Sequence, residues 1–174
     1  MSARRLNPAL VTGLLVLALA TIFQEGVVTY TSIDSVRPDV ILLLTLNWSL
    51  LRGVEEGMIW GLVGGIFVDL FSGLPFGTSS AAYVAVAGFT TLTERAFTRA
   101  HLLQPVLTAI MATFIYYTIA FVIVSSADNE FFLGAAFVRT VIGVAIFNAI
   151  VNPFLYWGIH QLDARLSPVA RTSL

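Results

Sequence analysis

The chain has 174 residues, of which 57% are hydrophobic and 11% are charged, whereas a soluble domain carries about a quarter charged residues. Charge is too scarce to cover a water-facing surface, so the composition predicts one all-α polytopic membrane domain over residues 1–174. The net charge of −1 gives no basic surface for nucleic acid, and the absence of cysteine excludes disulfides and thiolate metal sites.

Uncharged runs of the sequence predict a bundle of six transmembrane helices. A hydrocarbon core of about 30 Å takes about 20 helical residues, and two of the runs are shorter than this. The expected helices span residues 6–24, 38–51, 57–71, 81–96, 102–125 and 134–157.

The arginines orient these helices in the bilayer. With the N-terminus in the cytoplasm, the outer side carries only Arg37 and Arg139. The positive-inside rule therefore predicts six spans with both termini cytoplasmic. Three tryptophans near the proposed inner ends fit an interfacial belt: Trp48, Trp60 and Trp157. The arginines expected on the inner side are Arg4, Arg5, Arg52, Arg95, Arg99, Arg165 and Arg171.

The first apolar run allows a second interpretation. Arg4-Arg5, the uncharged residues after them and Ala18-Leu19-Ala20 resemble a cleaved secretory signal. Cleavage would leave five spans and an outer N-terminus. The run is long for a signal and nothing soluble follows it, so we expect it to form the first helix of the bundle.

The run over residues 57–71 carries a stripe of small residues. Gly57, Gly61 and Gly65 are four apart, and residues four apart share one face of a helix. Glycines at this step let a second helix backbone approach closely, which is the small-xxx-small pattern of membrane packing. The stripe predicts a face that packs against a neighbouring helix or a partner protein.

Asp69 lies four residues after Gly65, on the same predicted helix face, and is expected in the outer part of the membrane. A rise of about 1.5 Å per residue places Arg37, Asp39 and Asp69 at similar depths, and Arg139 reaches the same region. Since a lone buried carboxylate is costly, we expect a buried ion pair of Asp69 with Arg37 or Arg139. The pair either fixes helix register or leaves Asp69 to bind a proton or ion.

The stretch SGLPFG, residues 72–77, predicts a turn after this helix. Gly73 and Gly77 allow a positive φ, and Pro75 fixes the bend. Because the turn carries no charge, it is expected to be re-entrant or covered by protein. The alternative is a docking surface for a partner outside the membrane, with Phe76 as its anchor.

Other polar residues give no catalytic motif. The sequence contains no HExxH, GxSxG or phosphate-cradling loop, so no catalytic residue, metal or cofactor is expected. His101 and His160 are expected as interfacial polar residues at inner helix ends. Ser79 and Ser80 are expected to cap the helix that follows them.

Two asparagines beside Pro153 leave two interpretations open. Asn148 and Asn152 are four residues apart on the last predicted helix. They are expected to satisfy carbonyls freed by the proline, with contact to other helices as the alternative. Tyr116 and Tyr117 on the preceding helix are expected to serve packing rather than ligand contact.

Residues 37–53, RPDVILLLTLNWSLLRG, and 61–77, GLVGGIFVDLFSGLPFG, resemble the MreD family of bacterial rod-shape proteins. The family pattern is an Arg-Pro-Asp that opens a helix, then Gly-x-x-x-Gly-x-x-x-Asp and a Ser-Gly-x-Pro-x-Gly-like turn. The last helix matches more loosely, through its asparagines and proline. The matching residues are Arg37, Pro38, Asp39, Gly61, Gly65, Asp69, Ser72, Gly73, Pro75 and Gly77.

This resemblance implies a non-catalytic inner-membrane scaffold subunit of the cell-elongation machinery, which helps to organise peptidoglycan synthesis. Members of the family associate with the bitopic protein MreC. Through MreC they connect to the filament protein MreB, the polymerase RodA and a class B penicillin-binding protein. The family fold is similar to the S-components of energy-coupling-factor vitamin transporters.

That similarity supplies the alternative function, a vitamin-binding subunit of an importer. Such a subunit needs a polar cavity open to the outside, between the loops over residues 24–36 and 72–80. It also needs a small-residue face on the first helix for a coupling partner, which Ala9 and Gly13 would provide. A third possibility, an intramembrane enzyme, has no supporting residues.

Overall fold

A computed structural model of the chain describes residues 8–26, 36–96, 104–128 and 134–166. Within these ranges the regular structure consists of six helices, which confirms the predicted all-α class. They are α1 (Pro8–Gly26), α2 (Val40–Arg52), α3 (Val54–Phe71), α4 (Thr78–Ala96), α5 (Gln104–Asp128) and α6 (Ala135–Leu166).

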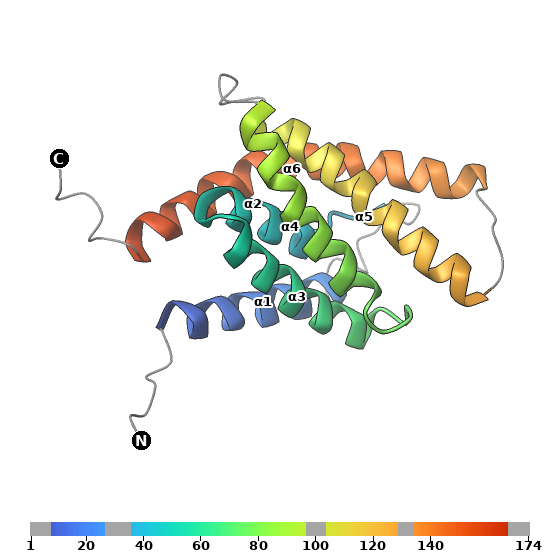
Figure 1. Cartoon of the computed structure of the whole chain (residues 1–174), viewed down its shortest axis with the longest axis horizontal. Coiled ribbons are helices and arrows are strands. Elements are labelled where there is room, and N and C mark those ends of the chain that lie inside the picture. The colour runs from blue at the N-terminus through green and yellow to red at the C-terminus, as the bar shows by residue number, and fades with distance from the viewer. Residues whose placement is uncertain (1–7, 27–35, 97–103, 129–133, 167–174) are drawn as a thin grey trace.

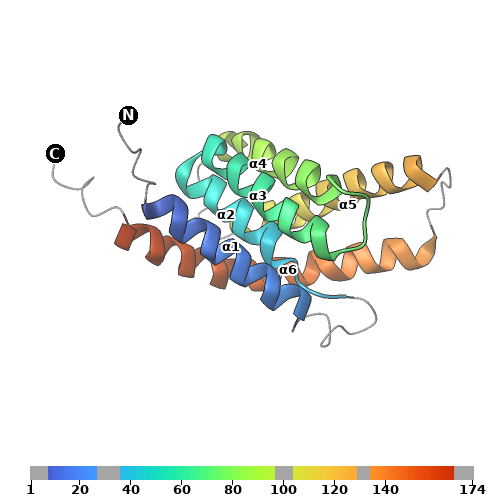
Figure 2. The same cartoon turned by 90° about the horizontal axis from the view of Figure 1, so that it is seen from below.

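The helices run in alternating directions through one bundle (Figures 1 and 2). Helices α1, α3 and α5 therefore finish at the end of the bundle where α2, α4 and α6 begin, and we call this the distal end. The first residue of α1 and the last residue of α6 lie together at the opposite, proximal end in both views.

Helix α2 is the central element and contacts each of the other five helices. Its residues Ile41 to Ser49 are all buried. A helix that is buried along most of its length is surrounded by protein, and this position explains its shortness. Its 13 residues span about 20 Å, less than the hydrocarbon core, but its sides face protein instead of lipid.

Helix α3 packs its glycines against two neighbours. A Cβ on Gly61 would lie 2.9 Å from the backbone carbonyl of Tyr83 on α4, and a Cβ on Gly65 would overlap the backbone of Ser80. Gly57 meets Ser49 of α2 equally closely. The stripe Gly57, Gly61 and Gly65 is thus occupied by helices of the same chain.

The helix ends differ in part from the predicted ones. Helix α3 begins at Val54, before the uncharged run, and carries Glu55 and Glu56 in its first turn. Carboxylates stabilise a helix N-terminus because its dipole is positive there, so these charges extend the helix. Helix α6 continues through Pro153 to Leu166, past the predicted end at residue 157.

Two tryptophans pack against each other inside the proximal half. The rings of Trp48 and Trp60 are buried and stack with centroids 4.0 Å apart. Trp48 also donates its indole N–H to Glu56 over 3.2 Å, and the Arg52 guanidinium lies 5.6 Å from its ring centroid. Trp48 and Trp60 are thus enclosed by other helices, whereas Trp157 is exposed on α6. The interfacial depth of the three tryptophans stays a prediction.

Among the described residues, two helical segments are long and apolar enough to cross a membrane: Gln104–Ala127 and Ala135–Leu162. Two further apolar segments, Leu15–Gln24 and Val40–Arg52, are shorter. Large apolar side chains are exposed on several helices, among them Leu19, Leu70 and Ile150, as a lipid-facing surface requires. The crossing of the bilayer by all six helices stays a prediction.

We predict that Gly65→Ala destabilises the bundle, because its Cβ would force α4 away from α3. Overpacking of this kind costs about 1–3 kcal/mol. The matched control is Gly158→Ala on α6, where a Cβ meets nothing within 4 Å. Thermal unfolding in mild detergent should show a lower Tm for the Gly65 variant and an equal or higher Tm for the control. Equal Tm values for both variants would contradict this packing.

Candidate functional site

The distal end contains a cavity of about 520 Å³ among the described residues. Small-molecule sites have volumes of about 300–1,000 Å³, so the cavity has the size of a ligand site. It lies between the end of α1, the start of α2, the turn after α3 and helices α4, α5 and α6. Its polar lining residues are Gln24, Arg37, Asp39, Ser72, Tyr83, Tyr116, Tyr117 and Ser125.

Asp39 is the buried carboxylate of the cavity wall. It caps α2 by accepting a hydrogen bond from the Leu42 N–H over 3.0 Å. The Tyr83 hydroxyl of α4 donates to the same carboxylate, at 3.0 Å from Oδ1 and 3.1 Å from Oδ2. The Asp39 N–H donates to Asn148 Oδ1 of α6 over 2.9 Å. One residue therefore ties the start of α2 to α4 and α6.

The two asparagines of α6 serve contacts between helices. Asn148 donates from Nδ2 to the Thr113 hydroxyl of α5 over 3.0 Å. Asn152 accepts from Asn47 Nδ2 of α2 and donates to the Pro105 carbonyl of α5, each over 2.7 Å. The interhelical alternative is confirmed, and no described bond of either asparagine goes to a carbonyl freed by the proline of α6.

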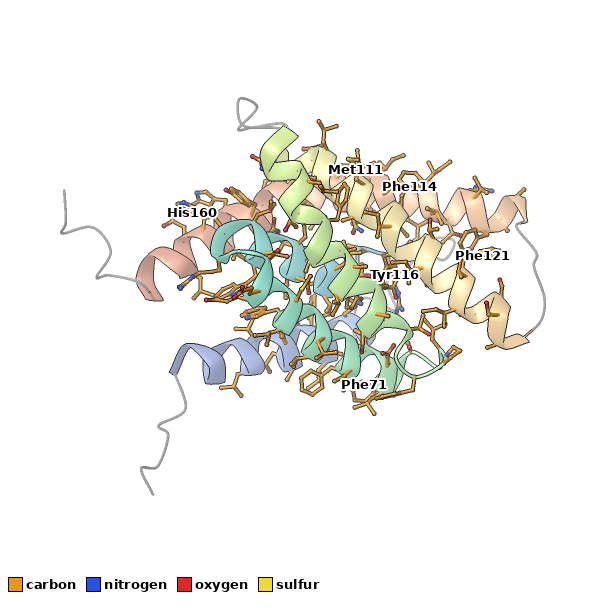
Figure 3. All side chains as sticks on the ribbon, in the orientation of Figure 1. Phe71, Met111, Phe114, Tyr116, Phe121 and His160 are labelled. Carbon is orange, nitrogen blue, oxygen red and sulfur yellow. The ribbon has the colours of Figure 1, made fainter. Side chains whose placement is uncertain are left out.

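Aromatic rings form a continuous wall along the cavity. Tyr83 stacks on Tyr116 with centroids 5.0 Å apart, and Tyr116 meets Tyr117 edge-on at 5.3 Å. Tyr117 then contacts Phe137, which contacts Phe121 at 5.3 Å. All five rings line the cavity. Figure 3 shows Tyr116 and Phe121 along α5, on the side toward the distal end.

Asp69 lies outside the cavity wall and caps α4 from the end of α3. Its carboxylate accepts the N–H groups of Gly77 (3.0 Å), Ser79 (2.8 Å) and Ser80 (3.2 Å). The Ser80 hydroxyl donates a further bond over 2.9 Å. The expectation that the two serines cap α4 is wrong, because the helix begins at Thr78 and both serines donate to Asp69 from its first turn.

The residues of the predicted ion pair differ in their exposure to solvent and in their neighbours. Arg37 is half-buried and lines the same cavity as Asp39, whereas Arg139 is exposed on α6. The carboxylate of Asp69 takes its four hydrogen bonds from residues 77–80. An ion pair of Asp69 with Arg37 or Arg139 stays a prediction, and its binding of a proton or ion does too.

Hydrogen bonds and two glycines fix the conformation of the turn over residues 72–77. Gly73 and Gly77 adopt φ values of 70° and 96°, which only glycine takes without strain. The Thr78 hydroxyl donates to the Pro75 carbonyl over 2.6 Å. Phe76 is 70% exposed and points away from this framework, so the turn presents one aromatic side chain at the distal end.

Tyr83 was not predicted from the sequence, although its hydroxyl donates to Asp39 and its backbone lies close to Gly61. A tyrosine hydroxyl buried in a lipid-embedded helix needs a partner, and this rule could have singled it out. His160 is exposed toward the proximal end (Figure 3), and His101 lies outside the described residues. The described residues contain no group of three His, Asp or Glu side chains that could hold a metal.

Comparison with known proteins identifies a family. A family model described as rod shape-determining protein MreD matches residues 4–162, which is nearly the whole chain. No curated protein and no solved structure matches the chain.

We predict that Asp69→Ala destabilises the distal end, because it leaves the buried N–H groups of Ser79 and Ser80 without acceptors. The loss should be about 3 kcal/mol in the free energy of unfolding. Ser72→Ala is the control in the same turn, since within the described part of the chain the Ser72 hydroxyl accepts one long hydrogen bond, of 3.4 Å from the Leu74 N–H. Hydrogen exchange should quicken at the Ser79 and Ser80 amides in the aspartate variant alone.

The same measurement tests the predicted ion pair. If an arginine neutralises Asp69, Arg37→Gln or Arg139→Gln should quicken hydrogen exchange at the Ser79 and Ser80 amides as Asp69→Asn does. If the N–H groups of α4 suffice, exchange at these two amides should keep its native rate in both arginine variants.

Proposed function

The chain belongs to the family of the rod shape-determining protein MreD, and from this membership we propose that it is a non-catalytic scaffold subunit of the cell-elongation machinery. Membership makes it a rod shape-determining membrane protein. The family match over residues 4–162 is the observation that carries the proposal. In this role the chain binds MreC, and through MreC it helps to organise peptidoglycan synthesis by RodA and a class B penicillin-binding protein along MreB filaments.

The arrangement of the helices supports a multi-pass topology with both termini in the cytoplasm. The first residue of α1 and the last residue of α6 lie at the same end of the bundle. An even number of crossings produces this arrangement, and the arginine distribution assigns that end to the cytoplasm. The distal end, with the cavity and the turn over residues 72–77, then faces outward.

The exposed apolar surface around that turn supports a docking role. Phe76 projects from it, and Leu70 and Phe71 at the end of α3 are also more than half exposed. Aromatic residues on a rigid frame make strong interface anchors because they lose little conformational entropy on binding. We assign this surface to the segment of MreC that lies at the outer membrane face.

The importer alternative receives mixed support. The cavity lies where that function requires it, since Gln24, Ser72 and Leu74 line it. The proposed coupling face on α1 is less favourable, because a Cβ on Gly13 would lie 2.8 Å from the Trp60 ring. That part of α1 packs against α3 of its own chain, which favours the scaffold over the transport subunit.

We predict that both termini are cytoplasmic. The chain has no cysteine, so single cysteines report their own position. In intact spheroplasts, Ser2→Cys and Ser173→Cys should resist a membrane-impermeant maleimide, whereas Phe76→Cys should react. Permeabilisation should expose all three. Labelling of only one terminus in intact spheroplasts would refute the topology.

We predict that Phe76→Ala weakens capture of MreC about tenfold and leaves the Tm of the isolated chain unchanged, because it truncates an exposed anchor. Phe154→Ala on α6 is the matched control: Phe154 is 76% exposed and Phe76 is 70% exposed. Co-purification with tagged MreC at several detergent concentrations measures the effect. Equal capture by both variants would exclude the turn as the docking surface.

A further inference from the structure

The scaffold function does not use the cavity at the distal end, and the charged side chains of its wall are matched by the chain itself. The Asp39 carboxylate accepts hydrogen bonds from the Leu42 N–H and the Tyr83 hydroxyl. It also bonds to the Gln24 side chain, and the positive charge of Arg37 attracts it. A charged ligand would bring an unmatched charge into this end of the bundle, so the wall favours an uncharged ligand.

Two hydroxyl groups of the same wall are unused. Tyr117 and Ser125 of α5 both line the cavity, and Ser125 is only 4% exposed. Within the described part of the chain, neither hydroxyl makes a hydrogen bond. The neighbouring Ser126 differs, because its hydroxyl donates to the Val122 carbonyl over 2.7 Å. Since a buried hydroxyl without a partner is costly, the two cavity hydroxyls point to a ligand that bonds to them.

The residues of α5 between these two hydroxyls form an apolar stripe. The cavity-lining residues of this stripe and its two ends follow the i, i+3, i+4, i+7, i+8 series of one helix face. They are Tyr117, Ala120, Phe121, Val124 and Ser125. A rise of about 1.5 Å per residue places the first and last of them about 12 Å apart along the helix axis. Helix α5 thus presents an apolar surface to the cavity, with one hydroxyl at each end.

Apolar side chains of other elements line the same cavity: Val68 of α3, Leu74 of the turn and Phe137 of α6. Water could bond to each of the two hydroxyls. Waters between them would lie against the apolar stripe, whereas a buried water typically makes about three hydrogen bonds to polar groups. An alkyl chain fits this stretch better, and it leaves polar groups at its two ends for the hydroxyls.

We propose that the distal cavity binds an uncharged, chain-like molecule with an oxygen-bearing group at each end and an alkyl middle. One end bonds to the Ser125 hydroxyl near the distal end of α5. The other end bonds to the Tyr117 hydroxyl, about two turns deeper in the bundle. The alkyl middle lies along Ala120, Phe121 and Val124. This inference goes beyond scaffolding and does not rest on MreC binding.

Calorimetric titration of the full chain with 1,8-octanediol tests the proposal, in a zwitterionic detergent without hydroxyl groups. The diol should bind saturably, and its affinity should fall about fivefold in Ser125→Ala and in Tyr117→Phe, since each variant removes one hydrogen bond. The controls are Ser126→Ala and, on α6, Tyr156→Phe, which should bind the diol like the native chain. Absence of saturable binding, or unchanged affinity in either cavity variant, overturns the proposal.

A second probe distinguishes hydroxyls that bond to the ligand from hydroxyls that hold the cavity in shape. 1-Nonanol has the shape of the diol, with a methyl group in place of one hydroxyl. Its single hydroxyl can turn to whichever protein hydroxyl remains, so Ser125→Ala and Tyr117→Phe should each weaken its binding by less than about twofold. Both variants should also keep or raise the native Tm, because they remove unpartnered groups. Equal losses for both probes, or a lower Tm in both variants, would overturn the assignment.

A further matched pair of variants locates the bound probe. Ala120→Leu fills the cavity from the apolar stripe and should abolish binding of the diol, whereas Ala127→Leu at an exposed position of the same helix should preserve it. Unchanged binding of the diol by the Ala120 variant would place the probe elsewhere and overturn the proposal.

Discussion

A polar group buried in this bundle must find its hydrogen bonds within the chain, and this constraint orders the distal end. Two carboxylates meet this requirement by accepting hydrogen bonds from N–H groups at the starts of two helices. Asp39 accepts the free N–H of Leu42 at the start of α2, and Asp69 accepts three N–H groups at the start of α4. Each pairing solves two problems at once, because the first N–H groups of a helix have no partner inside it and a buried carboxylate needs donors.

The rest of the fold follows from how closely the helices approach the central α2. Nine consecutive residues of α2 are buried, so its neighbours must pack around it on all sides. Helix α3 achieves this with glycines, since Gly57 meets Ser49 of α2 while Gly61 and Gly65 meet the backbone of α4. Lipid provides no hydrophobic driving force for helix association. Close contact between helix backbones therefore stabilises the bundle through dispersion attraction. The small-residue stripe is therefore an internal seam of the bundle.

Local patterns predicted much of this from the sequence. Hydropathy located the helices, and the four-residue step marked the glycine seam. Depth along a helix says nothing about direction around it, so counting residues could not reveal that Asp69 accepts hydrogen bonds from residues 77–80. The bond from Asp39 to Asn148 joins residues 109 apart in sequence. Such a contact depends on how six helices settle together, and no local pattern encodes it.

The cavity and the proposed docking surface share one short turn at the distal end. Ser72 and Leu74 line the cavity while Phe76 faces outward. Coupling between a ligand and MreC would require a second conformation of this turn with different affinities for the two partners. Asp69 bonds to Gly77, Ser79 and Ser80, and Thr78 bonds to Pro75, so the turn is fixed at several points. A ligand that leaves these bonds intact would stabilise the folded protein by mass action and leave the affinity for MreC unchanged.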